Sequence, residues 1–285
     1  SFYQITLCND FIRQASAENL AARGITGADA DAIKKYTFEA RFLRAYQYSI
    51  LMDLFGAVPF ATEKDALGSF MPKQASRVDV FNYVETELKA IENELPAAKA
   101  NEYGRADRGA AQALLARIYL NAGVYSTAQR YADALVYSKK VIDAGYSLIS
   151  NYRQLMLADN HTNTNEFILT INYDGLKTQN WGGTTFLTHA PVGGDMIAAD
   201  YGVDGGWGGI RTTKNLPAMF PDVNGTADKR AQFFSQGQSL DINDLTNFKD
   251  GYAVSKFRNR KKDNTVGSSL TWVDIDFPIF RLAEQ

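Results

Sequence analysis

The amino-acid sequence predicts a mainly α-helical fold of paired helices, followed by an irregular, glycine-rich loop region with a few short strands. Two observations lead to this fold class. Apolar residues recur at three- and four-residue steps over most of the first 145 residues, the spacing that places them on one face of a helix. Beyond that point, ten of the 22 glycines lie between residues 174 and 215, a density that is typical of loops.

The predicted helices have recognisable ends. Residues 29–55 carry one apolar stripe, and Gly56 is expected to end that helix. Ser76 and Asp79 resemble a capping box, in which each side chain binds the other residue's backbone N–H, and an apolar stripe then continues to Leu95. Further helices are expected over residues 107–122 with Gly123 as the stop, over 128–144 closed by Gly145, and, with a weaker pattern, over 7–22.

The segment 113–144 resembles a tetratricopeptide repeat, a unit of about 34 residues that folds into two packed helices. Small residues would let these helices approach each other, and tyrosines would fill the gap between them. Segments 41–56 and 80–95 are expected to form a second, diverged pair. We therefore predict a single domain over residues 1–285, with a helical repeat-like part at 7–145 and a loop-rich, ligand-binding part at 146–285.

Strands and a long loop are expected after residue 146. The apolar runs Phe167–Asn172 and Ala253–Arg258 predict short strands. Residues 174–215 read as a loop of about 40 residues, and loops of this length are usually functional in compact domains. The chain ends on a helix-favouring segment, 280–285, without a cap, and it has no initiator methionine. We interpret it as a fragment of a longer protein, truncated at both ends.

Charge and cysteine content exclude several classes of function. The 30 basic and 32 acidic residues leave a net charge of −2, which offers no bulk attraction to nucleic acid or anionic membranes. Cys8 is the one cysteine, so an intramolecular disulfide and a multi-cysteine metal site are excluded. No apolar run approaches the roughly 20 residues that span a bilayer. The short basic run 258–262 lacks interleaved aromatic residues and is expected to cap a hairpin in solvent.

The sequence contains few signs of catalysis or metal binding. It has two histidines and no Gly-x-Ser-x-Gly motif, and glycines 205–209 lack the ending of a phosphate-binding loop. Residues 159–166 loosely resemble a calcium loop but lack its turn glycine, so we prefer a solvated turn to a structural calcium near Asp159 and expect no cofactor. Counting leaves glycoside hydrolysis open, because 32 acidic residues always provide some pair of carboxylates.

Two tryptophans, Trp181 and Trp207, lie within the glycine-rich region. Neighbouring glycines have no side chains that could shield a large ring from solvent. Each ring is therefore either buried in the core by residues distant in the sequence or exposed as a platform. With Asn180 and Arg211 nearby as hydrogen-bonding groups, the pair favours a flat platform for a sugar ring. These four residues are the predicted ligand-binding residues. Trp272 lies in a strand-like segment and is assigned to structure.

Five segments of the chain form a recognisable set of motifs. They are Glu-Ala-Arg-Phe-Leu-Arg-Ala at 39–45, Asp-Leu-Phe-Gly-Ala-Val-Pro-Phe at 53–60, Gly-Arg-Ala-Asp-Arg-Gly-Ala-Ala at 104–111, Ala-Arg-Ile-Tyr-Leu-Asn-Ala-Gly at 116–123 and Asp-Phe-Pro-Ile-Phe-Arg-Leu-Ala-Glu at 276–284. These motifs resemble those of the SusD/RagB family of surface glycan-binding lipoproteins from Bacteroides-type bacteria. They occur in order along essentially the whole chain, which makes the resemblance specific.

The resemblance implies a helical fold on a tetratricopeptide-repeat scaffold and a protein that binds glycans without being an enzyme. It also implies a lipid anchor on the outer membrane, surface exposure, and partnership with a SusC-like TonB-dependent transporter. The loop 180–187 is similar to that of the starch-binding members, with Trp181 where a stacking tyrosine would be expected and Trp207 at the place of a second stacking aromatic. An α-glucan oligosaccharide is therefore the favoured ligand. A third stacking aromatic and the lipidated N-terminus would precede Ser1.

Three functions from different classes stay open at this point. A glycan-binding accessory protein requires Trp181 and Trp207 to be exposed and adjacent. A helical-repeat scaffold for a protein partner would bury them and leave bare helix faces. A glycoside hydrolase needs two carboxylates about 5 to 10 Å apart that face a cleft.

Overall fold

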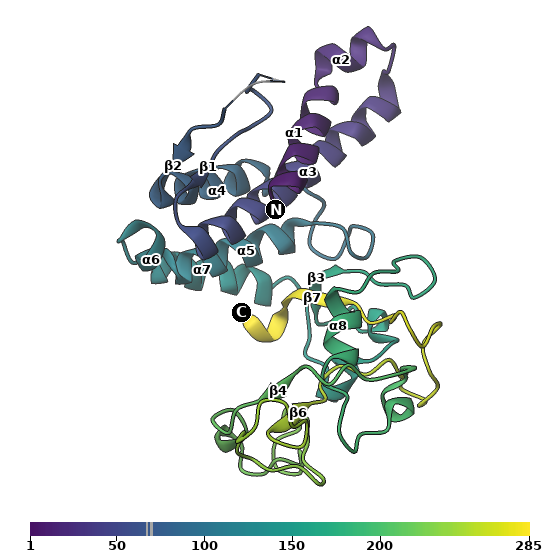
Figure 1. Ribbon diagram of the computed structural model, residues 1–285. Helices are drawn as coiled ribbons and strands as arrows, with labels where there is room; N and C mark the ends of the chain where they lie inside the picture. The colour runs from purple at the N-terminus through teal and green to yellow at the C-terminus, as the bar shows by residue number, and fades with distance from the viewer. Residues whose placement is uncertain (67, 69–70) are drawn as a thin grey trace. The chain divides into compact units, whose positions relative to one another are not determined.

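The computed structural model describes residues 1–66, 68 and 71–285, which form two compact units (Figure 1). The first unit comprises Ser1–Tyr146 together with Phe280–Gln285, and the second comprises Ser147–Ile279. The predicted change from helices to loops after residue 145 lies close to this boundary. Among the described residues, no helix combines the length and the hydrophobicity needed to cross a bilayer.

The first unit is helical, as the apolar spacing predicts, and the mainly helical fold class is confirmed. A short antiparallel pair of strands, β1 and β2, lies between α3 and α4 in the chain. The elements are α1 (Phe2–Gln14), α2 (Ala17–Ala22), α3 (Gly27–Phe55), β1 (Val58–Pro59), β2 (Gln74–Ala75), α4 (Arg77–Ile91), α5 (Arg108–Leu120), α6 (Ala122–Ser126) and α7 (Tyr131–Ile142).

Helix ends lie where the local chemistry predicts them in two cases. Ser76 and Asp79 form the expected capping box at the start of α4. Gly56 ends α3 with a φ of 74°, a backbone conformation that residues with a side chain rarely adopt.

Two other predicted helix boundaries were wrong. The helix expected over 7–22 is divided, because the Ser16 side chain accepts the Asn19 N–H and starts α2 as a separate helix. Gly123 is not a stop. Helix α5 ends at Leu120 with Asn121 as its C-cap, and Gly123 lies inside the short helix α6.

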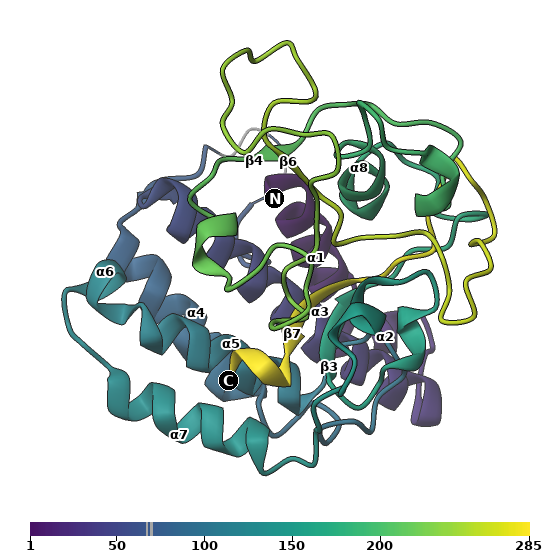
Figure 2. The ribbon, with the colours of Figure 1, turned by 90° about the horizontal axis from the view of Figure 1, so that it is seen from below.

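The helices of the first unit pack in pairs (Figure 2). Helix α3 lies against α1 and α4, and α5 lies against α7, so both predicted pairings are observed. Helices α3, α4, α6 and α7 all contact α5, which explains why α5 is buried along nearly its whole length. Leu115 and Tyr119 of α5 are fully buried, and the Tyr119 ring lies 5.5 Å from that of Tyr137 in α7.

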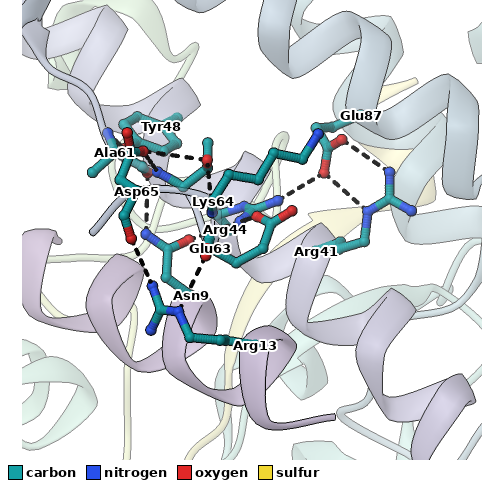
Figure 3. A network of polar contacts seen from close by, with 11 residues as sticks. Asn9, Arg13, Arg41, Arg44, Tyr48, Ala61, Glu63, Lys64, Asp65 and Glu87 are labelled. Carbon is teal, nitrogen blue, oxygen red and sulfur yellow. Dashed lines mark hydrogen bonds and ion pairs between the residues drawn. The ribbon is translucent and has the colours of Figure 1, made fainter. Parts of the chain in front are cut away.

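A buried ion-pair network joins α1, α3, α4 and the loop after β1 (Figure 3). The Arg44 guanidinium, 2% exposed, donates to Glu87 at 3.1 Å, to Glu63 at 2.5 Å and to Asn9 Oδ1 at 2.7 Å. Arg41 binds the Glu87 carboxylate through two N–H groups, at 2.9 and 3.0 Å. Burial acts to raise the pKa of Glu87, but hydrogen bonds and positive charge from the two arginines hold that pKa below its usual value.

The second unit has less regular structure around a small apolar core. Strands β4, β6 and β5 form an antiparallel sheet in that order, and β3 pairs with β7. The elements are the 3-10 turns η1 (Tyr152–Met156), η2 (Asn160–Thr162), η3 (Ala198–Tyr201) and η4 (Pro217–Met219), the helix α8 (Gly183–His189), and the strands β3 (Phe167–Ile171), β4 (Arg211–Thr212), β5 (Phe233–Phe234), β6 (Tyr252–Val254) and β7 (Phe277–Arg281).

The outcome of the predictions for this region is mixed. The strand expected at 167–172 is confirmed as β3, whereas the one expected at 253–258 is shorter and forms β6. The prediction that 174–215 lacks secondary structure was wrong, because α8, η3 and β4 lie within it. Helix α8 forms there with three threonines and His189 buried.

The helix-favouring end of the chain, 280–285, does not form an α-helix. Strand β7 continues to Arg281, and a 3-10 turn, η5 (Leu282–Glu284), follows. Pro278 biases the residue before it toward extended backbone. Phe280 is fully buried within the first unit, where its ring centroid lies 6.2 Å from that of Tyr46. These tertiary constraints override the local helix preference.

The substitution Leu115→Ala should lower the free energy of unfolding by about 2 to 5 kcal/mol, because it opens a cavity among packed helices. Denaturant unfolding followed by circular dichroism measures the loss. Leu120→Ala is the matched control in the same helix, since Leu120 is 60% exposed and its truncation should cost about 0.5 kcal/mol or less. Equal midpoints for the two variants would contradict the helix packing described above.

Candidate functional site

Three tryptophan rings of the second unit lie together, and we call them the aromatic platform. The ring centroids of Trp181 and Trp207 are 5.9 Å apart with an interplanar angle of 54°. Trp272 lies 4.3 Å from Trp181 at an angle of 56°. Trp181 is 61% exposed and Trp207 is 40% exposed. The two tryptophans singled out in the sequence are therefore adjacent and accessible.

Helix α8 supports the Trp207 ring. Phe186 and His189 are three residues apart, so they share one face of this helix. The His189 ring stacks on Trp207 with a centroid distance of 5.0 Å and an angle of 18°, and the Phe186 ring lies 6.0 Å away. The ring of Trp207 is thus held on one side while a large part of the residue stays open to solvent.

Backbone hydrogen bonds hold the Trp207 loop against the end of α8. The Trp207 N–H donates to the His189 carbonyl at 3.0 Å, and the Gly208 N–H donates to the Val192 carbonyl at 2.9 Å. The last carbonyl groups of an α-helix have no partner within the helix. The loop supplies partners at this end, so it is an ordered structure rather than a flexible linker.

The glycines of this region allow two backbones to come close together. A Cβ on Gly206 would lie 2.2 Å from the Val192 carbonyl oxygen, and a Cβ on Gly193 would lie 2.9 Å from Gly208 Cα. Any larger residue at these positions would push the Trp207 loop away from α8. The high glycine content therefore reflects tight backbone packing under the platform.

The buried His189 side chain joins two of the platform segments. Its Nδ1 lies 2.8 Å from the carbonyl oxygen of Gly205, and its Nε2 lies 3.0 Å from that of Thr271. Gly205 belongs to the loop of Trp207, and Thr271 directly precedes Trp272. One imidazole ring therefore positions both tryptophans through their backbones.

Asn180 lies next to Trp181 and organises the turn before α8. Its Oδ1 accepts the Gly182 N–H at 3.0 Å, and its Nδ2 donates to the Thr178 carbonyl at 3.1 Å. The amide is exposed and keeps one N–H and one acceptor lone pair for a ligand. Its role in ligand binding stays a prediction.

The structure places the Arg211 guanidinium against the loop 245–250. It donates to the carbonyl oxygens of Leu245 at 2.7 Å and Asp250 at 2.6 Å, and also to that of Asn247. The Phe248 ring lies 4.7 Å from the guanidinium carbon. These contacts give Arg211 a positioning role, and direct contact between Arg211 and a ligand stays a prediction.

Trp272 is the platform residue that sequence reasoning missed. It was assigned to structure because it lies in a strand-like segment, about 90 residues away from Trp181 in the chain. A Cβ on Gly175 would lie 2.4 Å from the Trp272 carbonyl oxygen, so this glycine allows the segment of Trp272 to approach. Gly175 could have indicated a close backbone approach, but only the folded chain shows that the approaching segment is that of Trp272.

The surroundings of Asp159 bear on the calcium hypothesis. The Asp159 carboxylate accepts the backbone N–H of Lys262 at 3.2 Å, and the Lys262 ammonium donates to Thr162 Oγ1 at 2.7 Å. An ammonium group this close to the turn disfavours a second cation. Across residues 1–66, 68 and 71–285, no group of three or more His, Cys, Asp or Glu side chains could hold a metal ion.

Sequence comparison now places the chain among proteins of known class. A family model described as starch-binding and associating with the outer membrane matches residues 15–120. The starch-binding protein SusD of Bacteroides thetaiotaomicron is 32% identical over 330 aligned positions, which cover 99% of this chain and 57% of that protein. The chain belongs to the SusD-like family. It spans little more than half the length of this relative.

Solved structures share the fold. Surface glycan-binding protein A from Bacteroides fluxus gives a TM-score of 0.70 at 24% identity, covering 97% of this chain and 57% of that one. A laminarin-binding SusD-like protein gives a TM-score of 0.70 at 21% identity, covering 96% and 63%. The predicted fold class, a helical SusD-like fold, is thereby confirmed.

The substitution Gly206→Ala should destabilise the protein by about 1 to 3 kcal/mol and change its tryptophan fluorescence, because the new methyl group overlaps the Val192 carbonyl. The adjacent Gly205→Ala is the matched control, since a Cβ there meets no atom within 4 Å. Thermal unfolding and emission spectra of both variants test this. A Gly206→Ala variant that matches Gly205→Ala in both measurements would disprove the close backbone packing.

Proposed function

We propose that this chain binds a glycan on the aromatic platform. The observation that carries the proposal is the exposure of Trp181 and Trp207 side by side, on loops held in place by backbone contacts. An exposed aromatic ring offers a flat apolar face that matches the C–H face of a sugar ring, and nearby polar groups can bind its hydroxyls. The exposed Asn180 amide, with its remaining donor and acceptor, is suited to the second task.

Among glycans, we favour α-glucan oligosaccharides of the starch type. The platform rings are inclined by 54° and 56° to their neighbours, so they form a bent surface that suits a curved α-glucan chain. The starch-binding relative and the description of the family model support this choice. A laminarin-binding protein shares the fold, so a β-glucan is the appropriate competing ligand in a test.

For the whole protein, we propose a surface-exposed lipoprotein of the outer membrane that delivers oligosaccharides to a SusC-like TonB-dependent transporter. The family description, with its association with the outer membrane, supports the location. The lipid anchor and the transporter rest on the family resemblance of the motifs. Delivery to a transporter requires an intact oligosaccharide, which is consistent with a protein that binds without cleaving.

The pKa of one carboxylate in the segment before Trp181 also favours binding over hydrolysis. A general acid for glycoside hydrolysis needs a pKa raised toward neutrality. The pKa of Asp174 is instead lowered, by the backbone N–H of Leu176 and by the positive charge of Lys177. A carboxylate of this kind stays ionised and accepts hydrogen bonds from sugar hydroxyls. The scaffold alternative predicts buried tryptophans, which the exposure of Trp181 argues against.

The substitutions Trp181→Ala and Trp207→Ala should each weaken maltoheptaose binding about tenfold or more. Each removes one stacking face, which is worth about 1 to 2 kcal/mol by analogy with base stacking on aromatic side chains. Isothermal titration calorimetry with maltoheptaose and with laminarin oligosaccharides measures the loss and identifies the preferred linkage.

The control for these variants is Tyr131→Ala, which removes an aromatic residue of similar exposure, 56%, from the first unit. It should leave binding unchanged. Melting temperatures of all three variants should stay near that of the parent. Intact binding combined with a lower melting temperature would show that the two tryptophans act as packing residues.

Purified protein should produce no shorter sugars from maltoheptaose, even at a high ratio of protein to sugar. Chromatography of the products over time is the direct measurement. The variant Asp174→Asn is the control for the acidic residue that precedes Trp181 by seven positions. Time-dependent products that disappear in Asp174→Asn would establish hydrolysis and overturn the binding-only proposal.

A further inference from the structure

A cavity of the second unit, away from the residues of the aromatic platform, is lined by several positively charged residues. It has a volume of about 190 Å³ and lies between the turn η1 and the hairpin at 258–264. Within the described part of the chain, its lining contains no acidic residue. Five cationic side chains contribute to the lining: Arg153, Arg258, Arg260, Lys261 and Lys262.

Two of the three arginines of this cavity have unused hydrogen-bond donors. Arg153 Nη1 and Arg258 Nε are buried atoms that have no partner among the described residues. Neither residue forms an ion pair with any residue that the structure describes. A buried charged donor without a partner is strongly unfavourable, so these atoms indicate a missing acceptor.

The arginines also disfavour each other. Burial lowers the pKa of Arg153, and the positive charge of Arg258 lowers it further. The guanidinium carbon of Arg258 lies 4.9 Å from the centre of the Tyr201 ring, a cation–π contact that fixes its position without neutralising it. An anion between the two guanidinium groups would remove both the repulsion and the unpaired donors.

The walls of the cavity are firmly connected. The backbone N–H of Arg258 donates to the Met156 carbonyl at 3.1 Å, and the backbone N–H of Ala158 donates to the Arg260 carbonyl at 2.9 Å. These two hydrogen bonds connect the hairpin to the end of η1 and the residues after it. The Arg260 guanidinium donates to the Asp200 carbonyl oxygen at 3.1 Å. The cavity is thus a preformed site and not a gap between mobile side chains.

One carboxylate is hydrogen-bonded to the lining residue Lys262. The Asp159 side chain accepts the backbone N–H of Lys262, while the Lys262 ammonium is directed to Thr162 Oγ1. Asp159 therefore neutralises part of the charge at the rim. Among the described residues, neither the Arg153 Nη1 donor nor the Arg258 Nε donor is hydrogen-bonded to this carboxylate.

We propose that this cavity binds a compact oxyanion of the sulfate or phosphate class, either as the free ion or as an ester carried by a sugar. Guanidinium groups present planar pairs of N–H donors that match the oxygen spacing of such groups. Arg153 and Arg258 supply the buried donors, and Lys261 and Lys262 supply charge at the opening. This site is separate from the aromatic platform and does not depend on glycan binding there.

The test is a titration of the whole chain with sodium sulfate, sodium phosphate, glucose 6-sulfate and, as a control, glucose, at constant ionic strength balanced with sodium chloride. Isothermal titration calorimetry and the melting temperature are recorded. We expect saturable binding and a higher melting temperature with an oxyanion but not with chloride or glucose. Tighter binding of glucose 6-sulfate than of both inorganic ions would identify the ester as the ligand.

Arg153→Gln and Arg258→Gln should each weaken oxyanion binding tenfold or more, and Lys262→Gln, at the exposed rim, should weaken it several-fold. Lys262→Gln keeps the test valid if a buried substitution impairs folding. Lys177→Gln removes an exposed lysine elsewhere in the unit and should have no effect.

Two results would overturn the proposal. One is that Lys177→Gln weakens binding as much as Lys262→Gln does, and the other is that the response to sulfate equals the response to chloride. Trp181→Ala should leave oxyanion binding intact, which separates this proposal from that of glycan binding.

Discussion

The helical unit depends on one buried guanidinium. Arg44 lies among α1, α3 and α4 and is 2% exposed. The free-energy cost of removing its charge from water is offset because Glu63, Glu87 and Asn9 all accept its hydrogen bonds. Loss of any one acceptor would leave a buried N–H of Arg44 without its partner, so the network favours joint assembly of the four segments. Arg41 and Arg44 both belong to the motif at 39–45 that first indicated the family. The motif therefore contains residues that the fold of this unit requires. In the sequence, these residues lie more than 100 positions before those of either proposed ligand site.

A different constraint shapes the second unit, where close backbone contacts replace a large apolar core. Gly206 lies against the Val192 carbonyl, and Gly175 lies against the carbonyl of Trp272. Because these backbones touch, hydrogen bonds can hold the loops without much buried side-chain area, and large aromatic rings can remain at the surface. This arrangement explains how a region rich in glycine keeps an ordered platform.

Features of the fold that depend on residues close together in the sequence could be predicted, whereas contacts between distant segments could not. Ser76 and Asp79 act over three residues, and Gly56 acts through its own φ angle, so both helix ends were predicted correctly. The exposure of Trp181 was also anticipated from its glycine neighbours. The contact between Trp181 and Trp272 was missed, because it depends on the tertiary fold alone. The end of the chain was predicted wrongly, because the burial of Phe280 outweighs a local helix preference that amounts to less than about 1 kcal/mol per residue.

The net charge of the chain also fails to reveal features that depend on the tertiary fold. A sum of −2 argues against a long-range field that would attract nucleic acid, since that attraction depends on charge averaged over a surface. It carries no information about a cavity, where the effective dielectric is low and only groups within a few ångströms count. The basic run at 258–262 was expected to lie in solvent, yet its first residue, Arg258, is partly buried beside Arg153, which is more than 100 residues earlier in the chain. Folding brings like charges together there, and the free energy that this costs is the physical reason to look for an anion.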